Sequence, residues 1–146
     1  MQRRWFFKAL AAGGAGLAML TRTAPARAAD PDKVVYHLAD LDKVGFVLGN
    51  IANHIHGVGG ADKVKIALVV HGPALRAFLT SAAAGEVAQA QAGLKGEGVE
   101  FDACANTMKA MKVTLADLLP GFVAAERGGV VRLAELQGQG YIYLRP

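Results

Sequence analysis

The sequence predicts an α/β fold in which a parallel β-sheet is covered by helices on both faces. Five short runs of β-forming residues alternate with helical segments along one stretch of the chain, an order typical of parallel sheets. The second run is apolar without interruption over residues 66–70, as expected for a strand that is covered on both sides. The sequence contains no internal repeat and no low-complexity segment.

Residues 1–28 have the layout of an export signal and are left out of the fold prediction. The twin arginine Arg3 and Arg4 is followed by an apolar run of about 12 residues, which is too short to span a bilayer comfortably. An Ala-Arg-Ala cleavage site occupies residues 26–28. The paired arginines favour the twin-arginine route, with an uncleaved membrane anchor as the alternative. We therefore expect a periplasmic protein.

Removing this segment changes the charge balance. The chain has 16 Lys and Arg residues against 12 Asp and Glu residues, and five of the bases but none of the acids precede residue 29. Residues 29–146 therefore carry 11 bases against 12 acids, a net charge near −1. We expect these residues to form one domain, with no nucleic-acid partner and no membrane contact after the signal is cleaved.

The first strand is predicted over residues 33–38, and Asp40 is expected to cap the helix that follows. In that helix, six apolar residues recur at helical spacing and form one arc: Val44, Val47, Leu48, Ile51, Ile55 and Val58. Asn50, Asn53 and His54 lie together on its flank. These polar groups indicate a subunit contact or the wall of a pocket, although a solvated flank is the commoner outcome of such a pattern.

The second strand is predicted over residues 63–71, where Gly72 and Pro73 stop it. A short helix is expected over residues 74–80 and a longer one over residues 86–95. Four residues of the longer helix fall on one face: Val87, Ala90, Gln91 and Leu94.

Residues 99–103 alternate between apolar and acidic side chains, which predicts the third strand. Asn106 and Thr107 are good N-cap residues. The next helix is therefore expected to start near Met108 and to continue to about Lys112.

The last part of the chain predicts a helical turn over residues 114–118, a weak strand over residues 122–125 and a final strand over residues 141–144. A helix is expected between these two strands, over residues 130–137. Val130, Leu133 and Ala134 of this helix are expected to face inward. Arg132 and Glu135 are expected to face outward.

Cys104 is the only cysteine, and it follows the third predicted strand beside the amino terminus of a predicted helix. Ligands and reactive groups gather at the carboxyl ends of parallel strands, and the positive end of a helix dipole favours a thiolate. A single cysteine cannot form an internal disulfide. In an exported protein it therefore indicates an intermolecular bond or a free reactive thiol, or else a buried cysteine that acts as a small hydrophobe.

His37 and His71 fall at predicted strand ends on the same edge as Cys104. If the three strands are neighbours, one of these histidines could accept the thiol proton or stabilise the thiolate, although a single histidine is more often structural. His54 and His56 are two residues apart on a helix and would point apart, and one cysteine with scattered histidines lacks the spacing of a zinc site. No glycine-rich phosphate loop opens a helix. We expect neither a metal nor a cofactor.

Four segments in this order make the sequence resemble the DsrE/DsrF-like family: Asn50-x-x-Asn53-His54, Val69-Val-His71-Gly72, Cys104-Ala-Asn106-Thr107-Met108 and Leu136-Gln137-x-x-Gly140-Tyr141. The resemblance extends from about residue 33 to residue 146. It implies a three-layer α/β sandwich with a mostly parallel five-stranded sheet, assembled into trimers or hexamers. The better-studied members carry sulfur as a persulfide on a cysteine that Cys104 matches. This chain differs from them in its export signal.

Together with the export signal, the resemblance therefore implies an exported sulfur-handling protein in which Cys104 carries sulfane sulfur for a donor or acceptor protein. His71 would be its proton partner, and the helix-start amides near Asn106 and Thr107 would stabilise the anion. His37 and Gly72 complete the expected binding residues. Two alternatives stay open. The strand-end rim could hold a small ligand that Cys104 merely lines, or the chain could be a structural module of a larger assembly.

Overall fold

The computed structural model describes residues 30–146, so the export signal predicted over residues 1–28 lies outside the described residues. Within this part of the chain, five strands form one sheet: β1 (Asp32–Leu38), β2 (Val64–Val70), β3 (Glu100–Cys104), β4 (Phe122–Ala125) and β5 (Ile142–Leu144). Their spatial order is β4-β3-β2-β1-β5, and every neighbouring pair is parallel. The predicted α/β class with a parallel five-stranded sheet is confirmed.

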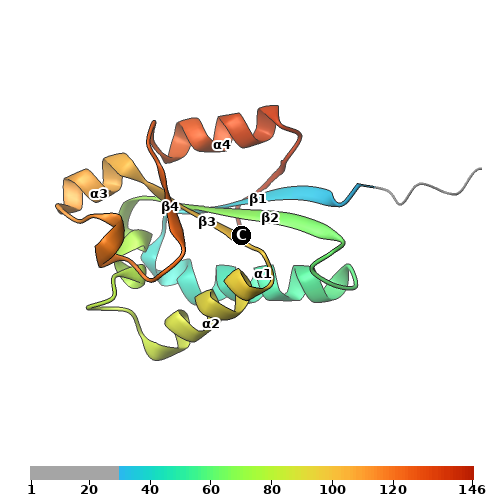
Figure 1. The fold of residues 1–146 in the computed structure, drawn as a ribbon, viewed down its shortest axis with the longest axis horizontal. Helices are drawn as coiled ribbons and strands as arrows, with labels where there is room; N and C mark the ends of the chain where they lie inside the picture. Colours follow the sequence, from blue (N-terminus) through green and yellow to red (C-terminus); the bar gives the residue numbers. More distant parts are fainter. Residues whose placement is uncertain (1–29) are drawn as a thin grey trace, which may run out of the picture.

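The described residues contain four α-helices: α1 (Val44–Gly57), α2 (Gly85–Gly96), α3 (Ala105–Met111) and α4 (Gly129–Gly138). They also contain three short 3-10 segments: η1 (Leu41–Lys43), η2 (Gly72–Phe78) and η3 (Leu115–Asp117). Helices α1 and α2 cover one face of the sheet and α4 covers the other, which gives three layers (Figure 1). None of the helices described is long and apolar enough to cross a membrane.

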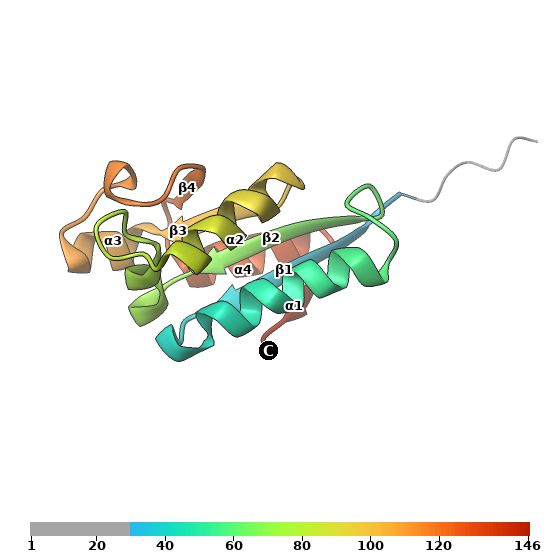
Figure 2. The same ribbon diagram turned by 90° about the horizontal axis from the view of Figure 1, so that it is seen from below.

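Most of the buried apolar side chains lie between the sheet and helices α1 and α2, which cross it side by side in the view from below (Figure 2). At the β3 and β4 side of this core, the ring of Phe122 meets those of Phe78 and Phe101 edge-on, at centroid distances of 5.2 and 5.4 Å. This core holds the strands in register, so that their carboxyl ends meet at one edge of the sheet.

The face of the sheet under α4 has a smaller apolar cluster and most of the reactive side chains. The cluster contains Val35, Ala67, Val69, Leu133, Leu136 and Tyr141. Because side chains alternate along a strand, Asp102 and Cys104 of β3 share this face, and His37 of β1 and His71 after β2 follow the same alternation. The neighbouring ends of β1, β2 and β3 therefore bring His37, His71 and Cys104 to one rim.

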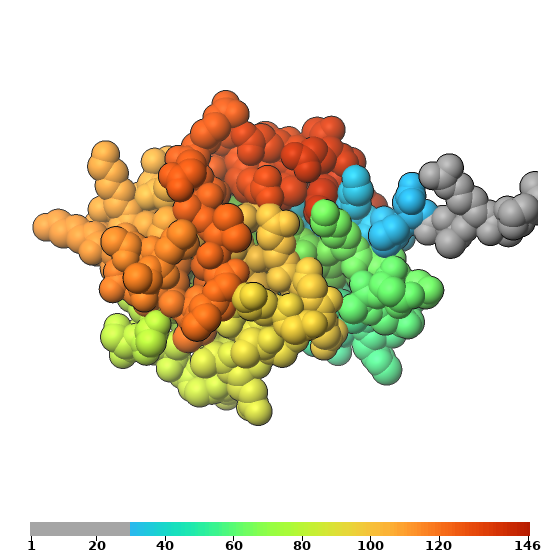
Figure 3. Space-filling model, viewed as in Figure 1, coloured from blue at the N-terminus to red at the C-terminus, as the bar shows by residue number. Residues whose placement is uncertain are grey.

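Strands β4 and β5 form the two edges of the sheet. Val123 of β4 and Ile142 of β5 are both exposed. In the space-filling view, the segment that carries α3 and β4, in orange, forms the surface beside α4, in red (Figure 3).

The structure corrects two predicted helix caps. Asp40 does occupy the N-cap position of η1, directly before α1, but its carboxylate makes no capping bond and instead accepts a hydrogen bond of 3.3 Å from Arg145. Helix α3 begins directly after Cys104, which occupies the N-cap position, so Asn106 and Thr107 lie in the first turn. The strand passes into the helix without a loop, and the N-cap preferences of Asn and Thr could not indicate such a direct junction.

The predicted orientation of α4 is wrong at three positions. Val130 is 70% exposed and Ala134 is exposed as well, although both were expected to face inward. Arg132, expected to face outward, points to the sheet and pairs with the buried carboxylate of Asp102. A buried charge requires a partner, so the helix turns its arginine toward the sheet.

Candidate functional site

Cys104 is the last residue of β3 and the N-cap of α3, and its side chain is only 6% exposed. The amides of Asn106 and Thr107, in the first turn of α3, act as donors toward its sulfur and lower the pKa of the thiol. The Thr107 hydroxyl and the amide of Gly129, the first residue of α4, act in the same way. The amino termini of two helices therefore converge on one sulfur atom.

These contacts determine the protonation of the thiol. Burial is the largest single effect and raises the pKa of Cys104, because a buried anion loses its hydration. The hydroxyl of Thr107 and the amides of Gly129, Thr107 and Asn106 together outweigh burial, and the pKa of Cys104 lies below its ordinary value. Every one of these partners is a hydrogen-bond donor, so the surroundings favour a thiolate.

The hydroxyl of Thr107 is oriented by a neighbour. The amide of Gly72 donates a hydrogen bond of 2.9 Å to the Oγ1 atom of Thr107. This bond occupies one lone pair of the oxygen, so the hydroxyl proton is left to point to the sulfur of Cys104. Gly72 thus contributes to the site indirectly, through Thr107.

Gly129 allows α4 to approach the thiol. A Cβ atom on this residue would lie 3.3 Å from the Cβ atoms of both Cys104 and His71, closer than most such contacts. The preceding Gly128 has a φ of 97°, a conformation that favours glycine. The pair of glycines therefore lets the first amide of the helix reach the sulfur.

His37 and His71 form a pair on the same rim. Their Nε2 atoms lie 2.5 Å apart, and their rings stack with a centroid distance of 4.7 Å. The Nδ1 atom of His37 lies 2.6 Å from the hydroxyl of Tyr143. Each of these contacts needs one donor and one acceptor, so protons can be aligned along Tyr143, His37 and His71 in either of two directions.

Both imidazoles favour the neutral form. Burial, followed by the charges of His71 and Arg145, lowers the pKa of His37 to about 4. Burial, followed by Arg145, lowers the pKa of His71. At neutral pH both rings are therefore uncharged, and each has one nitrogen that can accept a hydrogen bond.

Comparison with known proteins places the chain in a family. A sequence model of the DsrE/DsrF-like family matches residues 34–146. The chain belongs to the DsrE/DsrF-like family. A comparison with curated proteins gives no match.

Two solved structures have a fold similar to that of this DsrE/DsrF-like chain. One is a protein of unknown function, MTH1491, from Methanobacterium thermoautotrophicum, with 27% sequence identity and a TM-score of 0.69. That match covers 79% of this chain and 99% of MTH1491. The other is the YchN protein from E. coli, with 14% identity and a TM-score of 0.56, over 80% of this chain and 99% of YchN. The second likeness concerns the fold alone.

In this DsrE/DsrF-like domain, the residues singled out from the sequence fall into two groups. Asn106, Thr107 and Gly72 surround the sulfur of Cys104, the first two directly and the third through Thr107. His71 lies across Gly129 from Cys104, and its Nε2 atom is directed to His37. The thiol group and the histidine pair are therefore adjacent, and each has its own hydrogen-bond partners.

Sequence reasoning missed two members of the site. Gly129 was given no role, although a glycine pair before a helix is a signal for a close backbone approach. Tyr143 was assigned only to the final strand. Its contact with His37 depends on the pairing of β5 with β1, which the order of elements along the chain does not reveal.

A hollow of about 390 Å³ opens between η2 and α3 of this DsrE/DsrF-like domain. Its walls come from η2 and α3: Gly72, Pro73, Arg76, Asn106, Thr107, Ala110 and Met111. Asn106 and Thr107, which lower the pKa of the Cys104 thiol, belong to this wall, and Arg76 adds a positive charge to it. In residues 30–146, no group of three or more His, Cys, Asp or Glu side chains gathers as metal ligands would.

Proposed function

We propose that this member of the DsrE/DsrF-like family carries sulfane sulfur as a persulfide on Cys104. The observation that supports the proposal is the set of four hydrogen-bond donors around one sulfur atom, two of them amides from the first turn of α3 and one from α4. Such a set stabilises a thiolate before sulfur is accepted. It also stabilises the same thiolate when it leaves after transfer.

The loading step requires no external oxidant or reductant. With thiosulfate as the donor, the thiolate of Cys104 attacks the sulfane sulfur and a new S–S bond forms at the protein. The S–S bond of the donor breaks, and sulfite leaves with the electron pair. In the unloading step, an acceptor thiolate attacks the outer sulfur, and Cys104 leaves as a thiolate stabilised by its hydrogen-bond donors.

His71 is proposed as the proton partner of the thiol, with His37 behind it. Both imidazoles favour the neutral form, so His71 can take up the proton of a neutral thiol or of an incoming hydropersulfide. The contact between the two Nε2 atoms lets the proton move on to His37, whose other ring nitrogen contacts Tyr143. Asn106, Thr107 and Gly72 line the hollow through which a donor or acceptor would approach.

Intact-mass analysis after incubation with thiosulfate or polysulfide tests the proposal. We expect a gain of about 32 Da that is removed by dithiothreitol and is absent in Cys104→Ser. Absence of the adduct in a native protein whose thiol reacts with iodoacetamide would contradict the proposal. Because the sequence contains one cysteine, a gain in mass can be assigned to a single thiol.

A second candidate function is the binding of a small apolar ligand. It is favoured by a groove of about 460 Å³ between α1 and α2, lined mainly by small and apolar residues such as Gly45, Gly49 and Ala90. This groove lies on the helix pair that covers the opposite face of the sheet from Cys104. A ligand bound there should therefore be retained by Cys104→Ala, whereas sulfur loading should be lost.

The signal over residues 1–28 and the family resemblance support two further proposals. We propose that the protein is exported to the periplasm, which is tested by the amino-terminal sequence of the protein from the periplasmic fraction. We also propose a homo-oligomer, a trimer or a hexamer, which light scattering on the purified protein would measure. A monomer at working concentration would contradict the second proposal.

A further inference from the structure

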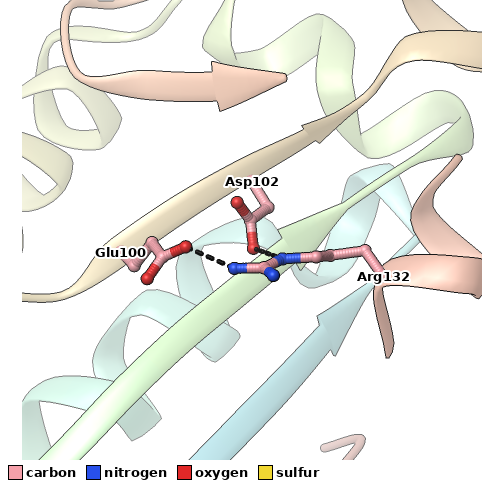
Figure 4. A network of polar contacts seen from close by, with 3 residues as sticks. All are labelled: Glu100, Asp102 and Arg132. Carbon is pink, nitrogen blue, oxygen red and sulfur yellow. Dashed lines mark hydrogen bonds and ion pairs between the residues drawn. The ribbon is translucent and has the colours of Figure 1, made fainter. Parts of the chain in front are cut away.

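A charged network lies between α4 and β3, next to the thiol. The guanidinium of Arg132 donates one hydrogen bond to Asp102 at 2.8 Å and one to Glu100 at 2.5 Å (Figure 4). The carboxylate of Asp102 is 2% exposed, whereas the side chain of Glu100 is 35% exposed. Asp102 is therefore the buried anchor of the network, and Glu100 is its outer partner.

The ion pair between Arg132 and Asp102 is not expected to add much to the free energy of unfolding. Burial raises the pKa of Asp102 more than the bonds from Arg132 lower it, so the surroundings disfavour the charged form of this carboxylate. Replacing a buried ion pair with apolar residues of similar size is often neutral or stabilising. What an ion pair provides better than an apolar contact is a defined geometry, because a guanidinium bonds its partners in fixed directions.

The ion pair joins α4 to β3, the same helix and strand that meet at the thiol of Cys104. Asp102 and Cys104 are two residues apart on one face of β3, about 6.6 Å along the strand. Arg132 and Gly129 are three residues apart on α4, about one turn of the helix. The amide of Arg132 also donates to the carbonyl of Gly128 at 3.0 Å, which ties the arginine to the first turn. The ion pair and the contact between Gly129 and Cys104 are thus two neighbouring attachments of one helix to one strand.

We propose that Arg132 is a positioning residue for Cys104. Its ion pair with Asp102 holds the first turn of α4 against β3, so that Gly129, on which a Cβ atom would lie 3.3 Å from that of Cys104, stays close to the thiol. This inference rests on the proposed function only in that the positioned thiolate would be the group that accepts sulfur. The positioning itself is a property of the resting protein.

The test is the rate of alkylation of Cys104 by iodoacetamide as a function of pH, in the full domain. The primary variant is Asp102→Leu with Arg132→Met, which removes one negative and one positive charge and keeps apolar volume in the buried site. Direct charge effects on the thiol largely cancel in this double variant. If the ion pair positions Gly129, the pKa of Cys104 rises and alkylation at pH 7 slows by about tenfold, as expected for one lost bond to an anion.

In the single variant Asp102→Leu, the direct charge effect and the loss of positioning change the alkylation rate in opposite directions. Removing a nearby negative charge would by itself lower the pKa of Cys104 and speed alkylation at pH 7. Loss of positioning acts in the opposite direction and slows it. Asp102→Ala serves if the leucine variant does not fold, and it is expected to change the rate in the same direction.

Arg127→Met is the matched control, because Arg127 pairs with Glu135 of α4 at the surface, and its side chain is 77% exposed. We expect its alkylation profile to equal that of the native protein. An unchanged or faster rate in the folded double variant would overturn the positioning role. An ordinary thiol pKa in the native protein would instead count against the proposed function, so the two failures can be told apart.

Discussion

The amide of Gly72 and the hydroxyl oxygen of Thr107 lie 2.9 Å apart, and this bond leaves the hydroxyl proton of Thr107 free to be donated to the sulfur of Cys104. Gly72 opens η2 after β2, and Thr107 lies in the first turn of α3 after β3. Neighbouring strands therefore supply both the donor to the thiol and the group that orients it. The pKa of Cys104 depends on a connection across the rim of the sheet as well as on its own helix.

Thr107→Val tests the hydroxyl donor. Valine has nearly the shape of threonine, so the packing is kept while one donor to the sulfur is removed. We expect the pKa of Cys104 to rise and alkylation at pH 7 to slow by about tenfold, the effect of one hydrogen bond to an anion. Thr107→Ser retains the hydroxyl and should stay close to the native profile. Equal profiles for the valine and serine variants would contradict the role of the hydroxyl.

The histidine pair predicts a dependence of stability on pH. The folded state lowers the pKa of His37 from its ordinary 6.5 to about 4, chiefly through burial. Between these pH values the unfolded chain binds a proton that the folded protein does not. The free energy of unfolding should therefore fall as the pH decreases from about 6.5 to about 4.

Urea unfolding of His37→Gln across that pH range checks this contribution. The variant should lose less stability than the native protein as the pH falls, because the depressed imidazole is gone. Other groups titrate in the same range, so the difference between the two proteins is the quantity of interest. His56→Gln, at an exposed position, is the control and should follow the native curve. Parallel curves for His37→Gln and the native protein would refute the prediction.

The order of elements was predictable because each strand and helix has a local signature. The apolar run of β2, the alternation of β3 and the glycines between elements all lie within a few residues of one another. The position of Cys104 at a strand end beside a helix followed from the same local patterns. What could not be predicted depends on contacts between distant segments.

Asp102 and Arg132 illustrate the limit. The alternation of β3 indicated that Asp102 points away from Phe101, and a surface position is the usual outcome for such a carboxylate. The second face of this strand is instead covered by α4, whose arginine turns inward to meet it. Only the packing of α4 on the sheet decides this, and the same packing brings Gly129 to Cys104. The local sequence of neither segment contains that information.

Arg76 is expected to influence the choice of sulfur donor. It lines the hollow beside Thr107 and is the positively charged side chain of that wall. For Arg76→Gln, we expect loading from thiosulfate, a dianion, to slow by about two- to fivefold at low salt, the modest effect of one exposed charge. Loading from cysteine persulfide, which carries less net charge, should change less. Equal changes for both donors would show that Arg76 does not act through its charge.

The two glycines of α4 give the sharpest test of the approach of this helix to the thiol. Gly129→Ala adds a Cβ atom 3.3 Å from those of Cys104 and His71, so the first turn of α4 must move by a few tenths of an ångström. We expect a destabilisation of about 1–3 kcal/mol, typical of overpacking, together with a higher pKa of Cys104.

Gly138→Ala is the matched control at the other end of the same helix, where an added Cβ atom meets open space. It should stabilise the protein by about 0.4–1 kcal/mol, because alanine restricts the unfolded chain more than glycine does. It should leave the thiol pKa unchanged. Thermal unfolding and the pH profile of alkylation measure the two effects separately. If Gly129→Ala altered stability without altering the thiol pKa, the amide of Gly129 would not be a donor that matters to Cys104.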